Sequence, residues 1–432
     1  MTTDHSPLTT AREGRLPWYR LIALNALAFA LGVVTNTLEP AVLGHRTLEA
    51  APGNKNTVIG LLTFAGLMVA VLWQPLIGDL SDRTRTRWGR RLPYFVGGGA
   101  ALITTLFLVA VVPGVAGLAA VLLLLQLSAN TVQAPSQALL PDHVPEQQRG
   151  AASGWKAALE ILAFVAGRQI SGRLVAEGEI LAAVAVAAAV VVGAVAIVAL
   201  VIGRGTASSN RGAPNLDVRR AFHFERRAYP SFGPWFVNRV LVWGGFIALS
   251  TFLLFFVIDV MGLPEARAQR FVGDVSALMG IGLLLVALPA GWLADRVGRR
   301  RLVAAASLAA AGGTALLLLA PSTTMALVAG GVLGVAVGVF LTVSWALATQ
   351  IVPGMEAARM LGLANIATAA GSGLGRLTGG LIIDPVNRLT GSASGGYFLL
   401  YGLACVAFLA GAAAILQLPS DAEPSPPARS ES

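Results

Sequence analysis

Amide side chains recur at helical spacing inside a stretch that is otherwise apolar. Within residues 118–140 four of them fall at i, i+4, i+7 and i+11, namely Gln126, Asn130, Gln133 and Gln137. That spacing places all four on one face of a helix. An amide that faces lipid is costly, so this face is expected to lie against protein or water. Such amides either hydrogen-bond a polar ligand in a cavity or tie neighbouring helices together.

A second apolar stretch, residues 18–39, repeats the pattern. Asn25 is followed by Gly32, Asn36 and Glu39 at i+7, i+11 and i+14, again on one side of a helix. Glu39 comes at the end of the stretch, where it is either an acid at the mouth of a cavity or a residue of the membrane surface. The sequence leaves both interpretations of Glu39 open.

Two ionisable residues interrupt the apolar stretch 151–174. Glu160 lies about 15 Å from a helix start near Gly150 at 1.5 Å per residue, and an acid at that depth marks a functional site. We expect Glu160 to bind and release a proton. Arg168 lies two turns further on, which is too far along the helix for a direct pair with Glu160.

Tryptophan side chains supply apolar faces on which a sugar ring stacks, and their N–H group donates a hydrogen bond. Trp345, beside Ser344, is the first candidate for such a contact, and Trp243 is the second. Four other tryptophans fall near the ends of apolar stretches and are expected at the membrane surface, namely Trp18, Trp88, Trp235 and Trp292. Arg239, one turn after Trp235, is expected there too.

The composition indicates that the helices which carry these residues span a membrane. Of the 432 residues, 55% are hydrophobic and only 12% are charged, whereas a soluble protein is about one quarter charged. A membrane-spanning helix needs about 20 apolar residues. The sequence predicts twelve spans, at 18–39, 56–77, 92–112, 118–140, 151–174, 180–202, 235–260, 269–293, 302–320, 325–350, 359–383 and 396–417. The predicted fold class is therefore an all-α integral membrane protein, and no removable signal peptide is expected before the first span.

Basic residues set the predicted orientation. With both termini in the cytoplasm, 22 lysines and arginines fall in inner segments and 6 in outer ones, as the positive-inside rule requires. The net charge of +9 is thus explained mainly by topology. For that reason we expect no nucleic-acid partner.

The twelve spans form two similar sets of six. Asn25 recurs 213 residues later as Asn238, and Arg168 recurs 208 residues later as Arg376. A duplication of this kind predicts two parallel bundles with a binding site between them. The predicted parts are a cytoplasmic tail at 1–17, the first bundle at 18–203, a central cytoplasmic loop at 204–231, the second bundle at 232–418 and a disordered tail at 419–432.

Both sets carry the same loop element after their second span. It comprises Gly78, Asp82, Arg83, Gly89 and Arg90 in the first copy, and Gly291, Asp295, Arg296, Gly298 and Arg299 in the second. This element resembles the loop signature of the major facilitator superfamily. The first copy, through Tyr94, and the segment 140–154 are also similar to the glycoside–pentoside–hexuronide:cation symporters and the sucrose-transporter-like group. The resemblance implies two pseudo-symmetric six-helix bundles.

The resemblance also implies that the loop element is a gate. Asp82 and Arg83 would contact helices of the second bundle, while Asp295 and Arg296 would contact the first, and these contacts would hold the cavity open to the outside. The alternative is that the arginines of 83–91 only anchor the topology. We assign Arg85 and Arg87 to anchoring and the remaining motif residues to the gate.

In the superfamily, the first, fourth, seventh and tenth spans line the central cavity. The predicted substrate-binding residues are Asn25, Asn36, Gln126, Asn130, Gln133, Trp243, Trp345, Arg168 and Arg376, and at least two amides of the span-four stripe are expected in the cavity. The two arginines would grip an anionic group or pair with acids such as Glu39 or Asp384, unless they reach the outer membrane surface instead. Glu160 and Glu39 are the predicted proton-coupling residues.

Other classes of protein lack support in the sequence. The single cysteine, Cys405, excludes a disulfide within the chain and a cysteine metal site. There is no nucleotide-binding loop and no nucleophile–base pattern, so an enzyme is not expected. Residues 56–77 contain no acid, whereas the melibiose-permease-like branch has its cation-binding aspartates in that span. Proton coupling, or facilitated transport without a coupling ion, is therefore favoured over sodium coupling.

The sequence thus predicts a secondary active transporter in the cytoplasmic membrane that moves a sugar or glycoside with a proton, as a monomer without a metal or cofactor. Export of drugs or metabolites on the same fold is the alternative within transport. A non-transporting accessory or sensor protein is the alternative of another class. Intact loop elements in both halves favour a moving transporter.

Overall fold

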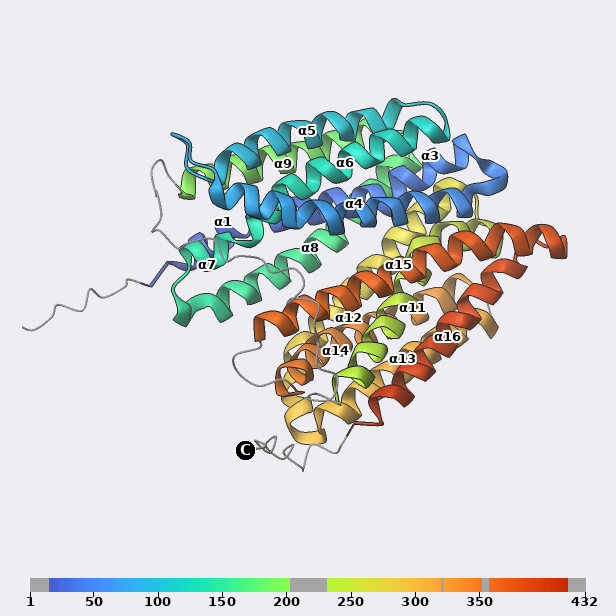
Figure 1. Cartoon of the computed structure of the whole chain (residues 1–432). Helices are drawn as coiled ribbons and strands as arrows, with labels where there is room; N and C mark the ends of the chain where they lie inside the picture. The colour runs from blue at the N-terminus through green and yellow to red at the C-terminus, as the bar shows by residue number, and fades with distance from the viewer. Residues whose placement is uncertain (1–14, 203–230, 320–321, 352–356, 419–432) are drawn as a thin grey trace, which may run out of the picture.

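The computed structural model describes residues 15–202, 231–319, 322–351 and 357–418. Within these ranges the chain is helical and contains no strand. Most of the predicted N-terminal tail, nearly all of the predicted central loop and the predicted C-terminal tail lie outside the described residues. Figure 1 shows two groups of long helices, one formed by the blue-to-green part of the chain and one by the yellow-to-red part.

The first group holds the helices before the central loop. They are α1 (Trp18–Leu24), α2 (Ala26–Thr37), a π-helical turn (Leu38–Val42), α3 (Leu43–Ala50), α4 (Lys55–Arg83), α5 (Leu92–Val111), α6 (Gly114–Gln137), α7 (Leu139–His143), α8 (Arg149–Ala176) and α9 (Ile180–Ile202), with short 3₁₀ turns at Pro52–Asn54 and Glu146–Gln148. The second group holds α11 (Phe232–Asp259), α12 (Glu265–Val297), α13 (Arg299–Leu319), α14 (Thr323–Ile351), α15 (Ala357–Thr390) and α16 (Gly395–Ile415).

The first predicted span is not one straight helix. It breaks between α1 and α2 at Asn25, whose φ of −97° and ψ of 3° leave the helical region. It then continues past the predicted end at residue 39, through the π-helical turn and α3 as far as Ala50. The sequence prediction ended the span at residue 39, directly before Pro40. The chain accommodates Pro40 in the π-helical turn instead.

Eleven of the described helical segments are long and apolar enough to cross a membrane. The predicted span at 151–174 forms α8, a continuous helix of 28 residues, or about 42 Å at 1.5 Å per residue. It is long enough to span, but Lys156, Glu160, Arg168 and Arg173 make it less apolar than the others. This helix packs on α12 of the second group, so its charged residues have protein and cavity beside them.

The two groups are tilted against each other and diverge toward the end that carries α7 and the connection between α4 and α5 (Figure 1). We call this end the loop side, and the opposite end, with α3 and the α15–α16 connection, the far side. Contacts between the groups run along α4 with α15 and α8 with α12. Gly60 of α4 and Gly380 of α15 meet backbone to backbone, since a Cβ built on Gly60 would lie 2.6 Å from the Gly380 Cα. Only glycine permits helices to approach this closely.

We expect Gly60→Ala to loosen this contact. The added methyl group collides with backbone atoms of α15, and overpacking of that kind costs about 1–3 kcal/mol. The midpoint of thermal unfolding in detergent should therefore fall. Gly97→Ala is the matched control, because a Cβ there meets nothing within 4 Å, and it should leave the midpoint unchanged or raise it. Equal midpoints for the two variants would contradict the close approach.

Candidate functional site

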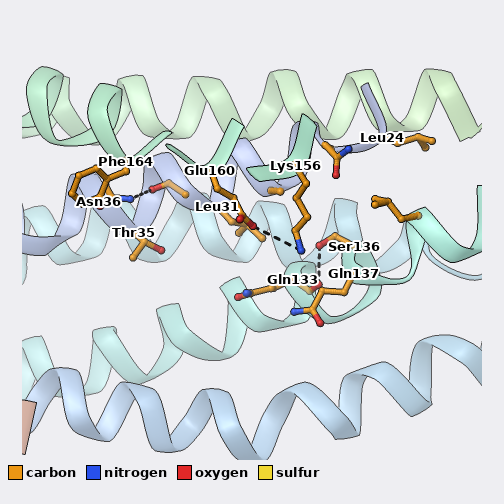
Figure 2. Close-up of a pocket in the computed structure, with 14 residues that line it drawn as sticks. Leu24, Leu31, Thr35, Asn36, Gln133, Ser136, Gln137, Lys156, Glu160 and Phe164 are labelled. Carbon is orange, nitrogen blue, oxygen red and sulfur yellow. Dashed lines mark hydrogen bonds and ion pairs between the residues drawn. The ribbon is translucent and has the colours of Figure 1, made fainter. Parts of the chain in front are cut away.

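A polar cavity of about 350 Å³ lies among α2, α6 and α8. Its polar lining comes from Asn25, Thr35, Asn36, Gln133, Ser136, Gln137, Lys156 and Glu160. Figure 2 shows Lys156 and Glu160 extending from α8 toward Gln133 and Ser136 on α6. The cavity thus combines amide groups, which both donate and accept hydrogen bonds, with one acid and one base.

A second cavity of about 510 Å³ lies between the two groups of helices and is lined from α8, α11, α12 and α14. We call it the aromatic cavity because Phe164, Trp243, Phe246 and Trp345 form much of its wall. Glu160 and Phe164 line both cavities. Glu160 therefore stands where the polar wall of the first bundle meets the aromatic wall of the second.

Glu160 pairs with a residue that sequence reasoning passed over. Its carboxylate oxygen lies 3.8 Å from the Lys156 Nζ, one turn earlier on α8. The side chain of Glu160 is 52% exposed within the cavity, so cavity water reaches the carboxylate. The signal was present in the sequence, because opposite charges four residues apart on a helix are neighbours.

The amide stripe of α6 divides between two roles. Gln133 and Gln137 line the polar cavity, as expected for at least two members. Asn130 instead accepts a hydrogen bond of 2.6 Å from Gln74 of α4, and Gln126 packs against Gly66 of the same helix. The structure thus places Gln126 and Asn130 outside both cavities. The reason is that α6 packs against α4 at these positions, where Trp73 also donates to the Thr131 hydroxyl at 2.9 Å.

The asparagines of the first span line the polar cavity, and both also hold helices together. Asn25 donates to the carbonyl groups of Leu21, at 2.9 Å, and of Ala152 in α8, at 3.1 Å, which fixes the break between α1 and α2. Asn36 donates to its own helix and accepts from Arg168 Nε at 3.2 Å.

Trp243 and Trp345 both line the aromatic cavity. The Trp243 N–H donates to the Ser372 hydroxyl at 2.9 Å, while the guanidinium of Arg239 lies 4.5 Å from the centre of the Trp345 ring. The expectation that Arg239 and Trp235 lie at the membrane surface is wrong. Both are buried, and Arg239 donates to Thr368 while Trp235 donates to the Ser344 carbonyl. The first turns of α11 are enclosed by α14 and α15, and the apolar pattern of the sequence did not indicate this burial.

The two repeat-related arginines lie in the contact between the bundles. Arg376 of α15 forms an ion pair of 3.2 Å with Glu39 of the first bundle. Arg168 of α8 is 7% exposed and donates to Ser250 and Ser276 of the second bundle at 3.0 and 3.3 Å. Neither residue lines either cavity, and Arg168 is enclosed by protein, so the alternative of reaching the outer membrane surface is wrong for it.

A chain of polar contacts closes the far side beyond these arginines. Lys55 pairs with Asp259 at 2.6 Å, and the Tyr397 hydroxyl donates to the same carboxylate at 2.6 Å. Asp384 of the second bundle accepts from the Asn56 side chain at 2.8 Å and from the Thr57 backbone N–H at 2.7 Å. The carboxylate therefore caps the start of α4 from across the interface, where a helix favours negative charge. No sequence spacing indicated this partnership.

The loop element of the first bundle pairs within its own bundle. Asp82 accepts from Arg91 at 2.9 Å, while Asp142 accepts from both Arg90 and Arg91 at 2.7 Å. Arg83 reaches only Asp79. Gly89 has a φ of +88°, a turn conformation that glycine adopts without strain, whereas Gly78 lies within α4.

The second copy of the loop element also makes its contacts within its own bundle. Asp295 lies 3.5 Å from Arg299, which donates to the Ala346 carbonyl at 2.9 Å, and Arg296 covers the Trp292 ring. Gly298 ends α12 with a φ of +95°, and Gly291 lies within that helix. Among the described residues, every ion pair that joins the two bundles lies on the far side: His45–Glu265, Lys55–Asp259, Arg270–Glu177 and Arg376–Glu39.

Comparison with known proteins identifies the family to which this architecture belongs. Residues 48–416 match the family described as MFS/sugar transport protein. The chain belongs to that family. It is therefore a multi-pass membrane transporter of the major facilitator superfamily, and the predicted superfamily and fold class are confirmed.

Individual relatives agree with this assignment. An uncharacterized symporter from Synechocystis sp. is 38% identical over 77 residues, a match that spans 18% of this chain and only 14% of that protein. The solved structure of the nucleoside transporter NupG superposes with a TM-score of 0.67 at 16% identity, covering 93% of this chain and 100% of the other. A bacterial homologue of the iron transporter ferroportin, in an inward-facing state, gives 0.66 at 15% identity, covering 93% and 98%. At such identities these structures show the shared fold.

We expect Asp142→Asn to destabilise the first bundle. The change removes the carboxylate that accepts from two arginines, one of them buried, and hydrogen bonds to charged groups contribute about 1.5–3 kcal/mol. The unfolding midpoint in detergent should fall. Glu146→Gln is the control, because the Glu146 side chain is 82% exposed and exposed ion pairs contribute little to stability. If both variants lost the same stability, the Asp142 cluster would have no special structural role.

Proposed function

We propose that this transporter couples the movement of a sugar or glycoside to the movement of a proton, by alternating access across the cytoplasmic membrane. The positive-inside bias supports a cytoplasmic loop side and cytoplasmic termini. Closure of the far side by inter-bundle ion pairs supports an inward-facing state for the structure. The protein works as a monomer without a metal or cofactor in this proposal.

The position of Glu160 carries the proposal. It is the only acid that lines either cavity, and Lys156 is its only ion-pair partner among the described residues. A proton that binds the carboxylate removes the attraction to Lys156 and frees the ammonium group to turn toward solute or solvent. Proton binding at this position would thereby change the polarity of the cavity wall that a solute meets.

The two cavities together suit a sugar. Gln133, Gln137 and Asn36 offer amide groups to hydroxyl groups on one side, and Trp243 and Trp345 offer indole faces to the apolar face of a sugar ring on the other. The description of the family as MFS/sugar transport protein supports the same substrate class. The apolar rest of the aromatic cavity, including Met279, favours a second candidate, the export of apolar drugs or metabolites.

We expect Glu160→Gln to abolish uphill accumulation of the sugar in proteoliposomes under a proton gradient. Exchange of labelled for unlabelled sugar across the membrane should persist, because it needs no net proton movement. Glu146→Gln, which lies outside both cavities, should retain uphill transport. Uphill accumulation by the Glu160→Gln variant would show that another group couples the proton.

We expect Trp345→Ala to weaken sugar binding. Loss of one aromatic contact of about 0.5–1.5 kcal/mol raises the dissociation constant about 2- to 13-fold, measured by quenching of tryptophan fluorescence across a panel of sugars and glycosides. Trp155→Ala is the control, since Trp155 lies on α8 outside both cavities. Binding of hydrophobic drugs with no response to any sugar would favour the exporter.

A further inference from the structure

Arg168 and Arg376 hold equivalent places in the two bundles but have different partners. Arg376 has the carboxylate of Glu39. The repeat that relates Asn25 to Asn238 relates Glu39 to position 252, which is a phenylalanine. Arg168 therefore lacks the acid that symmetry would supply, and it donates only to the neutral groups of Asn36, Ser250 and Ser276.

Each arginine reaches across the interface in this state. Arg376 belongs to the second bundle and its acid to the first, while Arg168 belongs to the first bundle and its two serine acceptors to the second. Glu39 follows Asn36, the remaining acceptor of Arg168, by three residues in the same predicted span. Glu39 thus pairs with Arg376 and lies three residues beyond the contact that Arg168 makes in the first bundle.

Opening of the far side changes both sets of contacts together. When the second bundle moves away, Glu39 loses Arg376, and Arg168 loses the hydroxyl groups of Ser250 and Ser276. An acid and a base are then left without their cross-interface partners, side by side in the same bundle. A charge in that position is costly without an opposite charge.

We propose that Glu39 exchanges Arg376 for Arg168 when the far side opens. The new ion pair lies within the first bundle and stabilises the outward-open state, so the single acid serves both states. The absence of an acid at Phe252 is what leaves Arg168 available for this exchange. The inference rests on the alternating access proposed above, and it adds a stabilising contact for the state that the structure does not show.

The test measures far-side opening by chemical labelling. In a Cys405→Ser background, Gln269→Cys places a thiol at a position that is 1% exposed and contacts the Ala41 carbonyl across the interface. A membrane-impermeant thiol reagent added to intact cells labels it only when the far side opens. Gly53→Cys, exposed on the far side, controls for reagent access.

Arg376→Gln should raise the labelling rate, because the closed state loses its ion pair with Glu39. Adding Arg168→Gln to that variant should lower the rate again, because the open state then loses the replacement pair. Without the exchange, Arg168 only ties the bundles together, so its removal would raise the labelling rate further and overturn the proposal.

Arg168→Lys in the same background should restore the labelling rate of the Arg376→Gln variant, which separates loss of charge from misfolding. Absence of far-side labelling in every variant, with Gly53→Cys still labelled, would refute alternating access and the exchange with it.

Discussion

An ionised side chain inside a membrane protein is stable only beside an opposite charge or a full set of hydrogen-bond partners, and this requirement organises the space between the two bundles. On the far side the partners belong to opposite bundles, as in Arg376 with Glu39 and Lys55 with Asp259. Charge compensation and closure of the interface are therefore the same event. On the loop side Asp82 and Arg91 satisfy each other within one bundle, so the bundles separate there without leaving either charge unpaired.

The walls of the two cavities are likewise divided between the bundles, and each bundle completes its own polar contacts. The first bundle contributes amides and the Glu160–Lys156 pair, which is complete within α8, and the second contributes indole rings held by Ser372 and Arg239. Neither wall needs the other for its own hydrogen bonds. A solute between them would meet polar groups on one side and aromatic faces on the other.

Much of the fold could be predicted from the sequence. The length of an apolar stretch, the basic residues of a loop and a duplicated motif each depend on one helix or one loop alone. Eleven of the twelve predicted spans and the superfamily follow from them. Part of the site was also accessible, since Gln133, Trp243, Trp345 and Glu160 carry their chemistry on recognisable faces. What could not be predicted depends on which helix lies opposite. The capping of α4 by Asp384, the burial of Arg239 and the use of Asn130 as a contact to Gln74 involve residues more than 50 positions apart. The Lys156–Glu160 pair is local, since the two residues lie one helical turn apart on α8, and their i, i+4 spacing is visible in the sequence.

The low apolarity of α8 has a consequence for how the chain enters the membrane. A lysine or arginine at the centre of an isolated helix opposes insertion by about 2.5–3.5 kcal/mol, and α8 holds four charged residues between Lys156 and Arg173. The next helix, α9, contains none and follows after a three-residue turn at Gly178. We therefore expect α8 to enter the bilayer together with α9, as a helical hairpin. The residues that serve the cavity in the finished protein thus make its fifth span depend on its sixth.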